Sequence, residues 1–204
     1  MFVVEKYLAN GDFNKMKARL VADGRDQGTA LYPDKSLPTV AIHSVFMALG
    51  LASGKLWQIV ITIDIKVAFV QTLMKGEPAY MKIDPKISHY VIDLFPKLEE
   101  MLEADGYLYT QLLKTMYGCI QVSALWYALI RSFLEELGYE CSQTDRCVFR
   151  KWVGERIAVL LLDVNDILAQ VDEKEAEHLR EHLRKRLEKY SLRLAQSFHV
   201  WGCR

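Results

Sequence analysis

The segment from Ile157 to Leu168 constrains this chain more than any other stretch. It reads Ile-Ala-Val-Leu-Leu-Leu-Asp163-Val-Asn165-Asp166-Ile-Leu, so an apolar run leads into an acidic turn and then into a second apolar run. Short apolar runs bounded by turn residues are typical of buried strands. The pattern therefore predicts two partner strands of a sheet, joined by a turn that carries acidic side chains.

A second segment, earlier in the chain, ends in the same way. The apolar run over residues 59–63 stops at Asp64, and the chain continues through Lys66 to Phe69. Carboxylates at the ends of neighbouring strands supply the oxygen ligands that hard divalent cations prefer. The two segments therefore predict a metal site, in which Asn165 places an uncharged amide where a charge is favoured.

Length and composition indicate a globular protein. The chain has 204 residues, of which 51% are hydrophobic and 25% charged, which is ample for one core. No apolar run approaches the roughly 20 residues of a membrane span, and the N-terminus lacks the layout of a secretory signal. Four cysteines, without a CxxC pair, favour neither a zinc site nor a disulfide framework. We expect an intracellular protein, cytoplasmic or nuclear, with reduced thiols and no membrane partner.

The charge distribution bears on nucleic-acid binding. The formal net charge is zero, whereas a stand-alone nucleic-acid binder is usually basic because phosphate contacts dominate its affinity. Neutrality disfavours tight autonomous binding but leaves room for a local basic groove. The first 25 residues contain such a set of cations, namely Lys6, Lys15, Lys17, Arg19 and Arg25.

Hydrophobic periodicity predicts the order of helices and strands. Helices are expected over 41–53, 122–137 and 173–190, with a broken helical region over 86–103, and strands over 58–63, 79–83, 147–152, 157–162 and 167–171, after an N-terminal strand pair that turns at Gly11-Asp12. In the first helix the predicted apolar face is Ile42, Val45, Phe46, Leu49 and Ala52. This order lacks regular alternation and predicts an α+β fold, an antiparallel sheet with helices packed on one face.

Several short blocks follow one another in an order that is informative as a whole. They are Lys17-Ala-Arg19-Leu-Val-Ala, Leu31-Tyr32 with Ser36-Leu-Pro38-Thr-Val40, Asp64 to Phe69, Leu113 to Gln121 with Trp126-Tyr127, Phe133 to Tyr139 with Asp145 to Phe149, and Leu162 to Leu168. Each block alone is a weak signal, but six in order are specific. On these blocks the chain resembles the reverse transcriptase domain of copia-type LTR retrotransposon polyproteins, from about Lys15 to about Gly202.

The resemblance implies an architecture of palm and fingers. The whole chain, residues 1–204, is then one reverse transcriptase domain fragment, with fingers over roughly 1–57 and 75–112 and palm over roughly 58–74 and 113–204. Trp201-Gly202 is similar to the primer-grip region of the family. No thumb is expected, which would leave little to clamp a duplex.

The resemblance also implies an activity, RNA-directed DNA polymerisation on an RNA or DNA primer–template with dNTPs. This nucleotidyl transfer uses two Mg²⁺ ions, for which Mn²⁺ is a possible substitute, about 3.5–4 Å apart. The implied metal ligands are Asp64, Asp166 and the backbone carbonyl of Ile65. Asn165 takes the place of a further acid, so Asp64, Asp166 and Asn165 form the implied catalytic set.

Five residues are implied to contact the nucleotide, and one of them, Ile65, is also an implied metal ligand. Lys17 and Arg19 would meet the triphosphate, Phe69 would act as a steric gate against a 2′-hydroxyl, and Gly118 would let the backbone approach the nucleotide and template. The plainer alternatives are two solvated cations on an edge strand and a core phenylalanine. Trp126 and Tyr127 are expected to serve helix packing.

Two departures from the family pattern put the activity in question. An amide at position 165 removes a negative charge beside the metals, and disturbed positioning can cost about 10²-fold or more in rate. Asp163 stands where the family has Tyr, and strand residues i and i+2 share a face, so one hypothesis is that Asp163 compensates for Asn165. The alternative to an impaired polymerase is a catalytically inactive remnant, or a module that binds nucleic acid or protein.

One competing motif points to a different chemistry. His178, Glu181 and His182 match the H-x-x-E-H string of an inverted zinc-peptidase site. The surrounding helix is dense in Arg, Lys and Glu, which is typical of a solvated amphipathic helix. We therefore expect these residues to lie on a surface helix.

Overall fold

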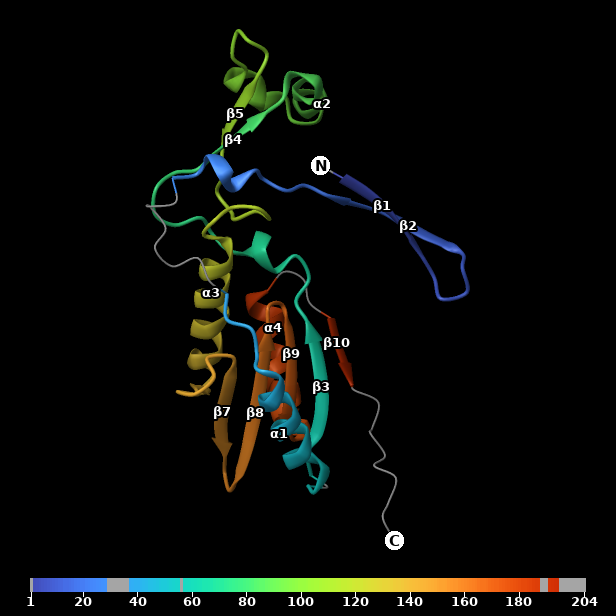
Figure 1. Cartoon of the computed structure of the whole chain (residues 1–204), viewed down its shortest axis with the longest axis vertical. Coiled ribbons are helices and arrows are strands. Elements are labelled where there is room, and N and C mark those ends of the chain that lie inside the picture. The colour runs from blue at the N-terminus through green and yellow to red at the C-terminus, as the bar shows by residue number, and fades with distance from the viewer. Residues whose placement is uncertain (1, 29–36, 56, 188–190, 195–204) are drawn as a thin grey trace. The chain divides into compact units, whose positions relative to one another are not determined.

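The chain divides into two compact units, which are described separately. The computed structural model describes residues 2–28, 37–55, 57–187 and 191–194 (Figure 1). One unit comprises residues 1–34 and 72–122, and the other comprises residues 35–71 and 123–204. The block from Leu31 to Ser36 and the Trp201-Gly202 pair lie outside the described residues.

The second unit is built on an antiparallel sheet whose described strands lie in the order β10-β3-β9-β8-β7-β6 (Figure 1). These strands are β3 (Ile59–Asp64), β6 (Glu140–Cys141), β7 (Val148–Val153), β8 (Arg156–Asp163), β9 (Asp166–Val171) and β10 (Ser191–Leu194). The predicted strand pair on either side of the acidic turn is confirmed as β8 and β9. Strand β9 pairs with β8 along one edge and with β3 along the other. Both acidic segments of the sequence therefore lie on neighbouring strands.

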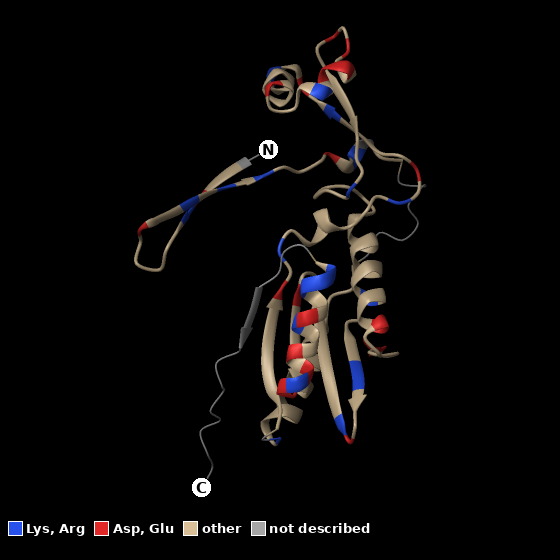
Figure 2. Cartoon of the chain, turned by 180° about the vertical axis from the view of Figure 1, so that it is seen from behind, with Lys and Arg blue, Asp and Glu red and all other residues tan. Residues whose placement is uncertain are grey.

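One face of this sheet carries the hydrophobic core. Alternate residues point to the same face of a strand, and the inward set is Ile61 and Ile63 of β3, Leu160 and Leu162 of β8, and Ile167 and Ala169 of β9, all buried. Helices α3 (Val122–Glu136) and α4 (Glu173–Arg186) cover this face (Figure 2). Burying one such side chain contributes about 1.5–3 kcal/mol, so this face dominates the stability of the unit.

Helix α1 (Ile42–Ser53) lies on the opposite face of the sheet (Figures 1 and 2). It contacts β8, and Leu161 and Gln170, which point away from α3 and α4, are buried as well. The predicted placement of helices on one face therefore describes α3 and α4 but not α1. The predicted apolar stripe of α1 is correct only in part: Val45, Leu49 and Ala52 are half-buried, whereas Ile42 and Phe46 are both 67% exposed.

The most deeply buried residues of α1 are small and lie beside the half-buried part of that stripe. Ser44 and Ala48 are the buried residues of α1, and a short side chain allows a helix backbone to approach a sheet closely. Apolar periodicity in the sequence identified the helix and part of its packed face, but it could not identify the small residues at the centre of that face.

Asp145 fixes the N-terminus of α1. Ala41, at the N-cap, makes no side-chain hydrogen bond of its own. Instead the Asp145 carboxylate accepts from the Ala41 backbone N–H at 3.1 Å and from the Ser44 hydroxyl at 2.7 Å, and its other oxygen accepts from the Cys147 N–H at 2.9 Å. Burial opposes ionisation of Asp145, yet these hydrogen bonds outweigh burial and lower its pKa. The Asp-x-Cys-Val-Phe block is thus a helix-capping device.

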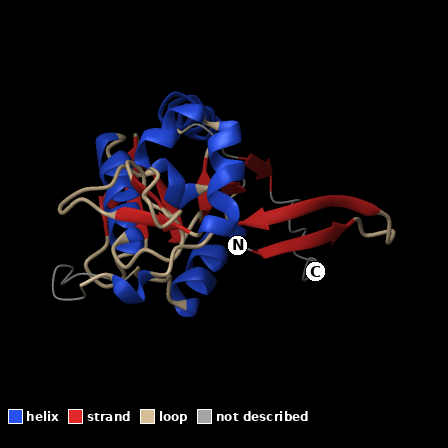
Figure 3. Cartoon of the chain, turned by 90° about the horizontal axis from the view of Figure 1, so that it is seen from above, coloured by secondary structure: helices blue, strands red, loops and turns tan. Residues whose placement is uncertain are grey.

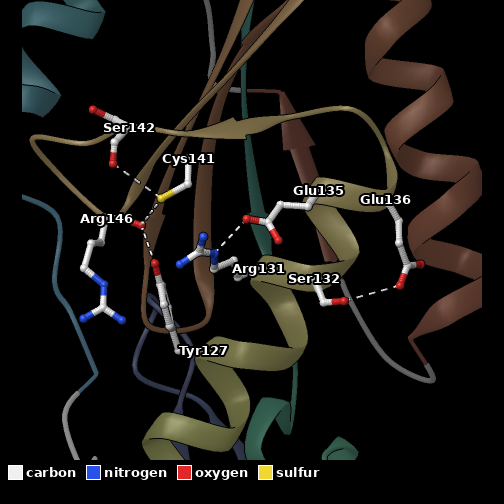
Figure 4. Close-up of polar contacts among 8 residues, drawn as sticks. All are labelled: Tyr127, Arg131, Ser132, Glu135, Glu136, Cys141, Ser142 and Arg146. Atoms are coloured by element: carbon white, nitrogen blue, oxygen red, sulfur yellow. Dashed lines mark hydrogen bonds and ion pairs between the residues drawn. The ribbon is translucent and has the colours of Figure 1, made fainter.

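The connection before β7 is tied to α3 by polar contacts (Figure 4). The Tyr127 hydroxyl donates to the Arg146 carbonyl at 2.7 Å, and the Cys141 thiol contacts the same carbonyl at 3.5 Å. On the exposed side of α3, Arg131 pairs with Glu135 at 2.8 Å, one helical turn away. Tyr127 is buried, so its expected packing role is confirmed and includes this anchor.

Helix α4 is the amphipathic helix that the sequence predicts. Its apolar stripe of Ala176, Leu179 and Leu183 is buried, and Figure 2 shows acidic and basic residues along it. Asp172 caps its N-terminus by accepting from the Glu175 N–H at 2.8 Å. The helix ends at Arg186 rather than Tyr190, because Leu187 adopts extended backbone angles.

Glu175 is a buried acid with two strong partners. Its Oε1 accepts from the Tyr139 hydroxyl and from Lys151 Nζ, each at 2.9 Å. Burial and the neighbouring Glu175 charge raise the pKa of Tyr139, which keeps its hydroxyl protonated as a donor. A buried carboxylate is stable only when it is paired in this way.

The first unit contains two strand pairs and short helices. Strands β1 (Phe2–Tyr7) and β2 (Phe13–Arg19) form a two-stranded ribbon, visible in Figure 3, as the sequence predicts. Strands β4 (Tyr80–Ile83) and β5 (Leu108–Gln111) form another, and helix α2 (Pro85–Leu94) starts at the N-cap Asp84. Among the described residues, the first unit also has the short 3-10 helices η1 (Gly24–Asp26) and η4 (Pro96–Met101). The second unit has η3 (Ala68–Gln71).

Two features of the composition have structural counterparts. Cys119, Cys141 and Cys147 are free thiols, and Cys203 lies outside the described residues. Among the helices of the described chain, none has the length and apolar character needed to cross a membrane.

Replacing Asp145 by Asn should lower the free energy of unfolding by about 2 kcal/mol, because hydrogen bonds to a charged group contribute about 1.5–3 kcal/mol. The lowered pKa of Asp145 sets the pH window. The extra stability is complete above the unfolded-state pKa of about 3.9 and is lost as the pH falls through the lower folded-state value. Urea unfolding across this range measures the difference.

Glu155→Gln, which removes an exposed carboxylate from the β7–β8 turn, serves as the matched control and should leave stability within about 0.5 kcal/mol of wild type. If Asp145→Asn were equally harmless at neutral pH, the capping role of Asp145 would be refuted.

Candidate functional site

Three aspartates lie side by side where β3 ends, β9 begins and β8 ends. Asp166 is the Cα partner of Asp64 on β3 and of Asp163 on β8. Residues directly opposite one another on paired strands project from the same face of the sheet. We call Asp64, Asp166 and Asp163 the acidic row. Within this row the structure brings the two predicted catalytic carboxylates, Asp64 and Asp166, opposite each other.

A two-residue turn, Val164-Asn165, links Asp163 to Asp166. The Asn165 side-chain amide donates to Asp64 Oδ1 at 3.1 Å, and the Ile65 backbone N–H donates to the Asn165 carbonyl at 2.9 Å. These two hydrogen bonds fasten the turn to the end of β3. Asn165 therefore lies in the turn rather than in a strand, and the argument that Asp163 shares its strand face was wrong. Asp163 faces Asp166 instead.

Val164 has an unusual backbone conformation that its surroundings hold in place. Its φ of 56° lies in the left-handed region, which a β-branched residue rarely adopts, at a cost of about 1–3 kcal/mol. Trp126 Nε1 donates to the Val164 carbonyl at 2.6 Å from the fully buried face of α3. Trp126 thus packs in the core, as predicted, and also anchors the turn.

Sequence reasoning missed this second role of Trp126, although a signal for it exists. A buried indole N–H almost always finds an acceptor, so a tryptophan on the buried face of α3 had to bond to something nearby. The acceptor could not be named before the fold placed α3 behind the β8–β9 turn.

The acidic row is electrostatically unfavourable as it stands. Burial raises the pKa of Asp166, and the neighbouring carboxylates of Asp64 and Asp163 raise it further. A cation at this position would relieve that repulsion.

The charged donors that the register places opposite each other at the strand ends are two carboxylates. Asp64 and Asp166 offer opposed carboxylates, and Mg²⁺ is commonly bound through one or two carboxylates together with substrate phosphates. Within the described residues, no three His, Cys, Asp or Glu side chains gather closely enough to hold a metal. Asn165 adds no charge, and its amide hydrogen points at the Asp64 oxygen.

The two other predicted residues of the β3 segment lie just beyond its end. Ile65 is fully buried, whereas Phe69, in η3, is half-buried and packs against the hydrophobic core. Val67 between them has a φ of 49°, a second β-branched residue in the left-handed region. The core-packing alternative for Phe69 thus has direct support, and its role as a steric gate stays a prediction.

Lys17 and Arg19 belong to the first unit. They alternate with Ala18 on β2, so they project from one face of the hairpin. Lys6 and Lys15 are Cα partners and belong to the same face, and all four cations are exposed. The predicted basic patch is therefore present on the hairpin, while its contact with a triphosphate stays a prediction.

Gly118 is required by the chain's own backbone. Its φ is 94°, and a Cβ placed there would lie 2.0 Å from the Ala22 carbonyl oxygen. Ala22 N–H also donates to the Tyr117 carbonyl at 2.7 Å. This close approach explains the glycine without a nucleotide, whose contact with Gly118 stays a prediction.

The residues of the zinc-peptidase string lie on α4. The rings of His178 and His182 are 4.2 Å apart, and the Glu181 carboxylate pairs with Lys185 at 2.7 Å. This pairing lowers the pKa of Glu181 through the hydrogen bond and charge of Lys185. The exposed, ion-paired Glu181 agrees with the expectation of a solvated surface helix.

A family model described as "Reverse transcriptase (RNA-dependent DNA polymerase)" matches residues 3–200, which include both units and the whole acidic row. The chain belongs to the reverse transcriptase family. This membership confirms the resemblance inferred from the ordered sequence blocks.

Two plant relatives support the same assignment of the reverse transcriptase domain. The chain is 30% identical over 166 residues to each of the "Retrovirus-related Pol polyprotein from transposon RE1" and the corresponding RE2 polyprotein, both from Arabidopsis thaliana. Each match covers 80% of this chain and 10% of the polyprotein, so the chain spans about a tenth of the length of these relatives. No solved structure matches the chain.

Replacing Trp126 by Phe should release the turn. The change removes the indole N–H and leaves the Val164 carbonyl without this hydrogen bond, which should lower the free energy of unfolding by about 1–3 kcal/mol. We expect faster hydrogen exchange at the Ile65 amide, which is bonded to the Asn165 carbonyl. Trp152→Phe is the control, because Trp152 is 67% exposed. Unchanged exchange at Ile65 in Trp126→Phe would show that the turn does not depend on this bond.

Proposed function

We propose that this reverse transcriptase domain carries out RNA-directed DNA polymerisation at the acidic row, and that Asn165 impairs it. The observation that supports this most directly is the register of Asp64 opposite Asp166 within a chain that the family model matches almost throughout. The substrates would be a primer–template and dNTPs. The chain spans about a tenth of the related polyproteins, and the proposal concerns this domain alone.

The residues that would hold Mg²⁺ are Asp64, Asp166 and the backbone carbonyl of Ile65. When bound, such ions activate the attacking 3′-oxygen and stabilise the leaving group of an in-line displacement. The chain's own contribution is to hold these ligands in place. The pairing of β3 with β9 sets the spacing of the carboxylates, and Trp126, through Val164, holds the turn beside them.

Asn165 changes the electrostatics of this site in two ways. It removes the negative charge that an aspartate would bring, which weakens attraction for a divalent cation. It also donates a hydrogen bond to Asp64 Oδ1, so that oxygen is partly neutralised before a metal arrives. Both effects lower metal affinity.

A second candidate function follows from the same hydrogen bond. If the Asn165–Asp64 contact holds the acidic row closed to metal, the domain is catalytically inactive, a retrotransposon remnant or a module that binds nucleic acid or protein. The exposed basic face of the β1–β2 hairpin would then be its nucleic-acid contact.

In the polymerase, four residues besides Ile65 would contact the nucleotide. Lys17 and Arg19 would neutralise the triphosphate, Phe69 would exclude a 2′-hydroxyl with the exposed part of its ring, and Gly118 would allow close approach of the backbone. The exposure of Lys17 and Arg19 on the hairpin and the half-burial of Phe69 are compatible with these roles.

Primer extension with Mg²⁺ or Mn²⁺ distinguishes the two functions. Asn165→Asp should raise the extension rate by about 10²-fold or more, because it restores a charged ligand beside the 3′-oxygen. Asp64→Asn, which is similar in size and lacks the charge, should abolish extension in either background. Equal extension by wild type and Asn165→Asp would contradict the proposed impairment, and extension by neither would favour the inactive module.

Substitutions on the hairpin test the triphosphate contacts separately. In an Asn165→Asp background, Lys17→Ala or Arg19→Ala should raise KM for dNTP about tenfold, since each removes one phosphate contact. Glu5→Gln, on the other face of β1, is the control for the same hairpin. An unchanged KM in both variants would show that Lys17 and Arg19 are solvated surface cations.

A further inference from the structure

The shared strand face that first suggested a role for Asp163 is absent, yet the fold gives this residue a different defined position. It is the last residue of β8, and its Cα partner is Asp166, which is in turn the partner of Asp64. The three side chains therefore project from one face of the sheet. Asp163 is exposed, and no hydrogen bond or ion pair within the described chain engages its carboxylate.

The position of Asp163 is held firmly by the backbone. The preceding residue, Leu162, is buried and donates its N–H to the Cys147 carbonyl at 2.8 Å. The following residue, Val164, is fixed by Trp126 Nε1 at 2.6 Å. Asp163 thus stands between two anchors at the end of a core strand, and its backbone is held opposite Asp166.

The charges of the site suggest what this carboxylate does. Asn165 is neutral and donates to Asp64, so the turn itself contributes no negative charge. With Asp163 included, the acidic row carries three carboxylates, the number that Asp64, Asp166 and an aspartate at position 165 would provide. The third carboxylate is therefore at the end of β8 rather than in the turn.

We propose that Asp163 is a positioning residue that supplies, from the outer shell of the site, the negative charge that Asn165 lacks for a divalent cation at Asp64 and Asp166. This inference rests on the proposed function. It assigns Asp163 a role through the electrostatic field and through metal-bound water, not as a direct ligand. That choice agrees with the absence, among described residues, of three carboxylates close enough to share one ion.

The test is a titration of the intact chain with Mn²⁺, followed by isothermal calorimetry and by the electron paramagnetic resonance of free Mn²⁺. Asp163→Asn should weaken Mn²⁺ binding about tenfold, as outer-shell substitutions at metal sites do. Glu155→Gln makes the same change of charge at the other end of β8 and should leave the affinity unchanged. Circular dichroism verifies that each variant is folded.

A double-mutant cycle makes the test specific. If Asp163 substitutes for the missing charge, Asp163→Asn should weaken binding less in an Asn165→Asp background than in wild type, because position 165 then supplies the charge. An equal loss in both backgrounds would show that Asp163 acts independently of position 165 and would overturn the inference.

The remaining outcomes separate this inference from the proposed function. If Asp64→Asn abolishes Mn²⁺ binding while Asp163→Asn leaves it unchanged, the metal site stands and the role of Asp163 is refuted. If only Asn165→Asp binds Mn²⁺ and wild type does not, Asp163 fails to compensate, and the inference is again overturned. If neither chain binds Mn²⁺, the proposed function fails and this inference fails with it.

Discussion

The pairing of β3 with β9 is the interaction on which the candidate site depends. These strands come from segments about a hundred residues apart in the chain, and their register places Asp64 directly opposite Asp166. The same register buries Ile61 and Ile63 beneath α3 and α4. A slip by one residue would turn every side chain of the strand to the other face, so the core that stabilises the sheet also positions the carboxylates.

The turn beside these carboxylates combines strain with restraint. Val164 adopts a backbone conformation that costs free energy, and the Trp126 indole together with the Ile65 and Asn165 contacts keeps it there. A strained backbone conformation of this kind persists only where contacts with the surrounding structure hold it in place. Here the restraint comes from the hydrophobic core through α3, which connects the stability of the unit to the geometry of the acidic row.

Several elements could be predicted because their signals are local. The β8–β9 pair, α3 and α4 were found from apolar runs and periodicity, and the buried stripe of α4 was named correctly. The packed face of α1 was found only in part, since Ser44 and Ala48 are buried through their fit to the sheet and, for Ser44, through Asp145, a residue about a hundred positions away. The relation of Asp163 to Asp166 was likewise missed, because it depends on where the strand stops and the turn begins.

The sequence by itself determined the family of this protein, the two acidic strand ends and the presence of an amide among them, because these are properties of residue identity and order. Only the tertiary structure decided which groups face one another: Asn165 donating to Asp64, Trp126 holding the Val164 carbonyl, and Asp163 standing beside Asp166. The physical reason is that hydrogen bonds and charge interactions depend on distances of a few ångströms between residues far apart in the chain. Those distances are set by the packing of the whole sheet and its helices.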